Sequence, residues 1–67
     1  MEKLREIRVA RHLSQKDIAD KLNVTSATIS RYESGERKLP VETAKRIAEV
    51  LKVDWYSLFD NAEQNDN

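Results

Sequence analysis

The chain has no cysteine, one glycine, one proline and few aromatic residues, which make up 6% of its 67 positions. Without cysteine it has neither a disulfide framework nor a thiolate nucleophile, and with His12 as its single histidine no structural zinc site is expected. No apolar run approaches the ~18 residues that a membrane span requires, and the first residues lack the apolar stretch of a signal peptide. We therefore expect a cytoplasmic protein without a metal, a cofactor, a membrane contact or an evident small-molecule site.

The sequence also lacks the arrangements that catalysis needs. It shows no nucleophile paired with a base, no glycine-rich phosphate loop and no carboxylate pair set apart from ordinary helix faces. An enzyme is therefore the class of protein that we expect least.

The formal net charge is zero, because 12 Lys and Arg residues balance 12 Asp and Glu residues. These charges are segregated along the chain. Residues 1–46 hold 11 bases and 7 acids, a balance of +4, whereas residues 47–67 hold one base and 5 acids, a balance of −4. Such a polarity would still orient the chain on a polyanion such as DNA, with moderate affinity and a strong dependence on salt.

Apolar residues at helical spacing predict two helices in the first third of the chain. Between them, Ser14 and Asp17 have the spacing of a capping box, which marks the start of the second helix. The residues predicted to face inward are Leu4, Ile7 and Ala10 in the first helix and Ile18, Ala19 and Leu22 in the second.

A tight reversal and a third helix follow. Asn23 is suited to the left-handed conformation that such a reversal needs, and Thr25 is suited to cap the next helix. Gly35 stands where a C-terminal glycine ends a helix, so the third helix is predicted over about residues 26–34. Its inward residues are predicted to be Ile29 and Tyr32.

The rest of the ordered chain is predicted to hold two more helices. Pro40 fits a first helical position, and Asp54 is suited to cap a last short helix from Trp55 to Phe59. The apolar stripe of the fourth helix is Val41, Ala44, Ile47, Ala48 and Leu51. We expect one domain over residues 1–59 and a disordered acidic and polar tail over residues 60–67.

Two short helices joined by a three-residue turn have the pattern of a helix-turn-helix, whose second helix enters the major groove of DNA. Ala19 is small where the two helices must approach closely, and Ile29 would hold the second helix to the core. The sequence resembles the Cro/repressor (Xre-type) helix-turn-helix family of transcriptional regulators, although Asn23 stands where that family usually has glycine. The matching stretches are Leu4–Arg8, Leu13–Ala19, Val24–Gly35 and Ile47–Leu51.

The resemblance implies an all-α fold, a five-helix lambda-repressor-like domain with a central helix-turn-helix. With Ile29 in the core, a helical wheel of about 100° per residue places Ala27 and Arg31 on the opposite, exposed side. By resemblance the base-reading residues are Ser26, Ala27 and Arg31, with Thr28 and Ser30 at the margin. The phosphate-contacting residues implied in the same way are Gln15, Thr25, Arg37 and Lys38. Arg8 and Glu33 match positions that form a structural ion pair.

The function implied is sequence-specific binding of double-stranded DNA by a small repressor, of the type found in phages or mobile elements. Because one short helix reads few base pairs, we expect a homodimer on a palindromic operator. Its predicted seam is Val53, Trp55, Leu58 and Phe59. The alternative is a protein-interaction module of the same fold, such as an antitoxin or a repressor antagonist, which the neutral net charge favours.

Overall fold

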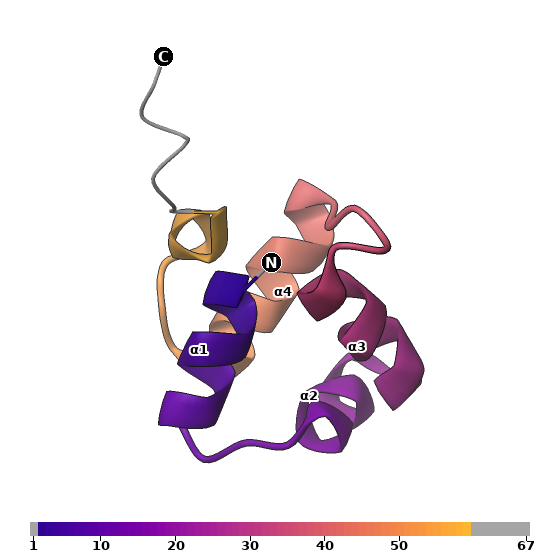
Figure 1. Cartoon of the computed structure of the whole chain (residues 1–67). Helices are drawn as coiled ribbons and strands as arrows, with labels where there is room; N and C mark the ends of the chain where they lie inside the picture. The colour runs from indigo at the N-terminus through magenta and orange to yellow at the C-terminus, as the bar shows by residue number, and fades with distance from the viewer. Residues whose placement is uncertain (1, 60–67) are drawn as a thin grey trace.

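The computed structural model describes residues 2–59, and the predicted tail, residues 60–67, lies outside the described residues. Within residues 2–59 the chain forms four α-helices and one 3-10 helix, without a strand. These are α1 (Glu2–Ala10), α2 (Gln15–Leu22), α3 (Ser26–Ser34), α4 (Val41–Leu51) and η1 (Trp55–Phe59). In Figure 1, α2 and α3 lie together on one side of the molecule, α1 and η1 lie on the other, and α4 runs between them.

The start of α2 is the predicted capping box. The Asp17 N–H donates to Ser14 Oγ at 2.9 Å, and the Ser14 N–H donates in return to Asp17 Oδ2 at 2.8 Å. Because these bonds satisfy backbone donors that have no acceptor inside the helix, they define where α2 begins. The bond from the Ser14 N–H also stabilises the ionised carboxylate, so the pKa of Asp17 lies below its ordinary value.

The turn between α2 and α3 also has the predicted chemistry. Asn23 adopts the left-handed conformation, with φ of 65°, and its N–H donates to carbonyls of the last turn of α2. Thr25 Oγ1 accepts from the Thr28 N–H at 3.3 Å and so caps α3. At the other end of α3, Gly35 has φ of 85° and its N–H donates to the Tyr32 carbonyl. These residues therefore determine where α3 begins and ends, and its bounds match the predicted range.

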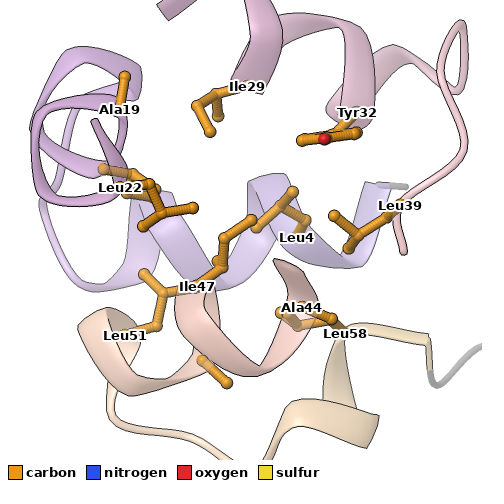
Figure 2. Packing of buried hydrophobic residues seen from close by; sticks show 12 residues of the cluster. Leu4, Ala19, Leu22, Ile29, Tyr32, Leu39, Ala44, Ile47, Leu51 and Leu58 are labelled. Atoms are coloured by element: carbon orange, nitrogen blue, oxygen red, sulfur yellow. The ribbon is translucent and has the colours of Figure 1, made fainter. Parts of the chain in front are cut away.

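The core is formed by side chains from every element. Its largest fully buried members are Leu4, Ile18, Ile29, Ile47, Leu51 and Leu58. Figure 2 shows Ile29 and Tyr32 of α3 pointing toward Leu4 and toward the apolar side of α4. Since burial of one such side chain contributes roughly 1.5 to 3 kcal/mol, these contacts hold α3 in a defined orientation.

Four details of the sequence prediction are wrong. Ala10 and Val41 are exposed, because α1 ends at Ala10 and Val41 is the first residue of α4, so neither reaches the core. Pro40 is the residue before α4, with an extended ψ of 150°, rather than its first helical residue. The fifth helix is the 3-10 segment η1, in which the Ser57 N–H donates to the Asp54 carbonyl three residues back.

No helix among the described residues is long and apolar enough to span a membrane.

Candidate nucleic-acid interface

The two sides of α3 differ sharply in character. Its inner side carries Ile29, Tyr32 and Glu33, all of them buried. Its outer side exposes Ser26, Ala27, Ser30 and Arg31, which are the residues predicted to read bases together with Thr28. The outer side is therefore a short exposed ridge, mostly polar, with one long cationic side chain.

Thr28 differs from the other four predicted base-reading residues. It is only half-exposed, and its hydroxyl lies 3.1 Å from the Thr25 hydroxyl. Both side chains thus belong to the N-terminal cap of α3. Thr28 therefore lies beside the exposed ridge as well as in the cap of α3.

Two of the four predicted phosphate-contacting residues, Arg37 and Lys38, lie in the exposed link between α3 and α4. The Arg37 N–H donates to the Arg31 carbonyl at 3.1 Å, so the link is tied back to α3. Within residues 2–59 the side chains of Arg31, Arg37 and Lys38 form neither a hydrogen bond nor an ion pair. Three cations near one end of α3 are therefore available to a ligand.

A buried carboxylate joins α1, α2 and α3 behind this surface. Arg8 Nε donates to Glu33 Oε2 at 2.6 Å, and Arg8 Nη2 donates to Oε1 at 3.2 Å. The two side chains are 12% and 5% exposed, respectively. Gln15, the third predicted phosphate-contacting residue, donates through Nε2 to the same Oε1 at 3.0 Å. Arg8 Nη1 also donates to the Leu13 carbonyl at 2.8 Å, so one guanidinium holds both α3 and the chain leading into α2.

Two further arginines have structural roles that sequence reasoning missed. Arg11 Nε donates at 2.6 Å to the carbonyl of Leu51, the last residue of α4. Arg46 Nη2 donates at 3.1 Å to the carbonyl of Leu22, the last residue of α2. Cations suit helix C-termini, where carbonyls lack partners. No local pattern signals these bonds, because the partners are 40 and 24 residues apart in sequence.

The predicted dimer seam needs one correction. Leu58 is 0% exposed because it packs into the core of the monomer, so it has no surface to offer a partner. Val53, Trp55 and Phe59 are half-buried, and neighbouring Tyr56 is 60% exposed. The Trp55 ring packs edge-on against Phe59, with ring centres 6.1 Å apart, and Lys45 Nζ lies 5.6 Å from the Trp55 ring centre.

The helix-turn-helix family model matches residues 4–58, which include all of α2, α3 and α4. The chain belongs to this family, and the match confirms the resemblance drawn from sequence.

Its relatives include proteins named as regulators of transcription. The chain is 43% identical over 58 residues to an uncharacterized HTH-type transcriptional regulator of Bacillus subtilis, RghRB, covering 85% of this chain and 42% of that protein. It is 40% identical over 58 residues to the HTH-type transcriptional repressor RghR of the same organism, covering 85% and 43%. It is 32% identical over 63 residues to the cryptic phage CTXphi transcriptional repressor RstR of Vibrio cholerae, covering 94% and 57%.

The chain thus spans roughly 40 to 60% of the length of these relatives. The search of solved structures returned no match.

Proposed function

We propose that the chain binds double-stranded DNA sequence-specifically as a transcriptional repressor, with α3 as the recognition helix in the major groove. The observation that carries this proposal is the division of α3 into a side buried against the other helices and an exposed ridge that ends in Arg31. Membership of the helix-turn-helix family and the names of the relatives support it. The likeness to a cryptic phage repressor favours a regulator of the phage or mobile-element type.

In this proposal the outer ridge of α3 reads base edges. Arg31 donates to O6 and N7 of a guanine, a contact worth roughly 1 to 3 kcal/mol of discrimination against other bases. Ala27 packs against a thymine methyl, and Ser26 and Ser30 form shorter, less selective hydrogen bonds. The exposure of all four side chains agrees with these roles.

Phosphate contacts come from residues on both sides of that ridge. Arg37 and Lys38 approach the backbone from the link after α3, and Gln15 and Thr25 lie at the N-terminal ends of α2 and α3. Backbone N–H groups at helix N-termini attract anions, so each of these two residues acts beside a suitable partial charge. Such contacts set the position of the protein on DNA without reading its sequence.

We further propose that two copies bind a palindromic operator, with α3 helices about 34 Å apart in adjacent turns of the major groove. The seam proposed for this dimer is Val53, Trp55 and Phe59, to which the exposed Tyr56 is added in place of Leu58. Sedimentation of the complex with a palindromic duplex tests the stoichiometry. A chain that saturates such a duplex as a monomer contradicts this part of the proposal.

Selection of bound duplexes from a random pool tests the function as a whole. The expected result is a two-fold symmetric consensus, and Arg31→Ala should relax it at one position in each half. Recovery of duplexes without a consensus would contradict sequence-specific binding.

The second candidate, a protein-interaction module, is favoured by the zero net charge. A salt titration separates the two functions, because release of counterions makes duplex affinity fall steeply with salt. Partner binding that does not change with salt, without duplex binding, would support the protein module.

A further inference from the structure

Among the residues that the structure describes, the buried carboxylate of Glu33 binds Arg8 and Gln15, which have different predicted roles. Arg8 is its ion-pair partner, whereas Gln15 is a predicted phosphate-contacting residue at the first position of α2. The ion pair with Arg8 is sufficient to compensate the buried charge of Glu33. The additional bond from Gln15 is not needed for that purpose. That bond connects the interior of the molecule with the surface that faces DNA in the proposed function.

The chemistry of the partners determines how the Gln15 amide is turned. An ionised carboxylate only accepts hydrogen bonds, so the amide must direct its nitrogen, rather than its oxygen, toward Glu33. One N–H of Nε2 is then held by Glu33 Oε1 at 3.0 Å. The other N–H remains for a second acceptor, and Gln15 is half-exposed at a helix N-terminus, where an anion is favoured.

The charge of Glu33 would by itself oppose a phosphate at this place. Arg8 removes that obstacle, because its Nε and Nη2 donate to the two carboxylate oxygens at 2.6 and 3.2 Å. The carboxylate therefore keeps the ability to accept from Gln15 while its charge is compensated. An amide that is already ordered also loses less rotamer freedom when a phosphate binds.

We propose that Glu33 is a positioning residue for Gln15: it holds one N–H of the amide so that the other N–H is presented to a DNA phosphate at the start of α2. Arg8 contributes by compensating the negative charge of Glu33. This inference rests on the proposed DNA binding and deepens it. Through this bond, the position of α3, which carries Glu33, affects a phosphate contact made by Gln15 of α2.

A mutant cycle on duplex affinity tests the coupling. The background that removes Glu33 carries Arg8→Met together with Glu33→Met, since apolar replacement of a whole buried ion pair is often tolerated. Gln15→Ala is expected to weaken binding about ten-fold in the native background, as for a hydrogen bond to a charged group, and less than about two-fold in the Met background. Lys38→Ala, the control at a predicted phosphate contact that makes no bond to Glu33 within residues 2–59, should weaken binding by the same factor in both backgrounds.

Equal losses from Gln15→Ala in the two backgrounds would overturn the positioning role while leaving DNA binding intact. A native chain that binds no duplex would instead overturn the proposed function, and this inference with it. The native titration distinguishes the two failures before any variant is made.

A second measurement uses the native chain alone and does not depend on how the Met background folds. Nuclear magnetic resonance resolves the two Nε2 protons of Gln15 during titration with a duplex. The expected result is that the proton free to meet a phosphate changes its shift more than the proton bound to Glu33. A larger change at the proton bound to Glu33, or no change at either proton, would overturn the inference.

Discussion

Two sets of basic residues in this molecule have opposite environments. Arg8, Arg11 and Arg46 donate to a carboxylate or to carbonyls near helix ends, and we call them the capping arginines. The exposed cations of the proposed DNA-reading surface, namely Arg31, Arg37 and Lys38, form no such bond within residues 2–59. The first set holds helices to one another, and the second is available to a partner.

The difference shows why the net charge alone does not decide between the two candidate functions. All six residues carry one positive charge, so a count along the sequence treats them alike. What distinguishes them is whether the fold already supplies an acceptor. Within residues 2–59, three arginines of this neutral chain are bound to internal acceptors, whereas Arg31, Arg37 and Lys38 are exposed without such a bond. Substitutions in the two sets should therefore affect different properties.

The largest effect is expected from Arg8→Ala. It leaves the Glu33 carboxylate buried without its counter-ion, which should lower the free energy of unfolding by about 3 to 5 kcal/mol. Chemical denaturation followed by circular dichroism measures the loss. Arg31→Ala is the matched control and should change stability by no more than about 0.5 kcal/mol, as at other surface sites. A loss of less than about 1 kcal/mol from Arg8→Ala, typical of an exposed ion pair, would contradict the distinction between the two sets.

Arg31→Ala should show the reverse pattern when duplex binding is measured. We expect the preference at one base pair in each half-site to fall by about 1 to 3 kcal/mol, with stability unchanged. Lys38→Ala should instead weaken all duplexes alike and reduce the salt slope by about one unit. Binding to a panel of single-base operator variants distinguishes these results. A uniform loss from Arg31→Ala would remove it from the base-reading residues.

Arg46→Ala should cost about 1 kcal/mol of stability, because the Leu22 carbonyl at the end of α2 loses its charged donor. Arg37→Ala, which removes an arginine without an internal partner, is the control and should leave thermal unfolding unchanged. If the two variants melt at the same temperature, the bond from Arg46 contributes nothing measurable.

The smallest effect concerns the start of α2, where Asp17 caps the helix. The Ser14 N–H, and then the Ser14 side chain, lower the pKa of Asp17 from its ordinary value of 3.8. Its contribution to stability is therefore complete above pH 3.8 and is lost as the pH falls through the lower pKa of the folded state. The stability difference between the native chain and Asp17→Asn should shrink in acid. A difference that is independent of pH would contradict this.

Much of the fold was predictable because its signals are local. Ser14, Asn23, Thr25 and Gly35 act on backbone groups within a few residues of themselves, and the structure places α3 at the predicted residues. The errors occur at helix ends and where a residue's environment depends on distant elements. Ala10 and Val41 have the right spacing but lie at helix ends, and Leu58 is covered by the core.

The candidate site shows the same contrast between features set by local sequence and features set by contacts with other helices. Periodicity was sufficient to predict that Ala27 and Arg31 lie opposite Ile29, since all three share one helix. It could not predict that Thr28 turns its hydroxyl toward Thr25, or that Gln15 donates to Glu33. The second bond joins residues 18 positions apart and exists only when α2 and α3 are packed.

The sequence by itself determined where α2 and α3 begin and end, which side of α3 is apolar and which family the chain belongs to. These properties depend on hydrogen bonds and side-chain spacing within a turn or two of helix. Only the tertiary structure decided which arginines are bound internally, which apolar residues are covered and how Glu33 meets both Arg8 and Gln15. Those outcomes require acceptors and neighbours from other helices, and packing alone brings them within reach.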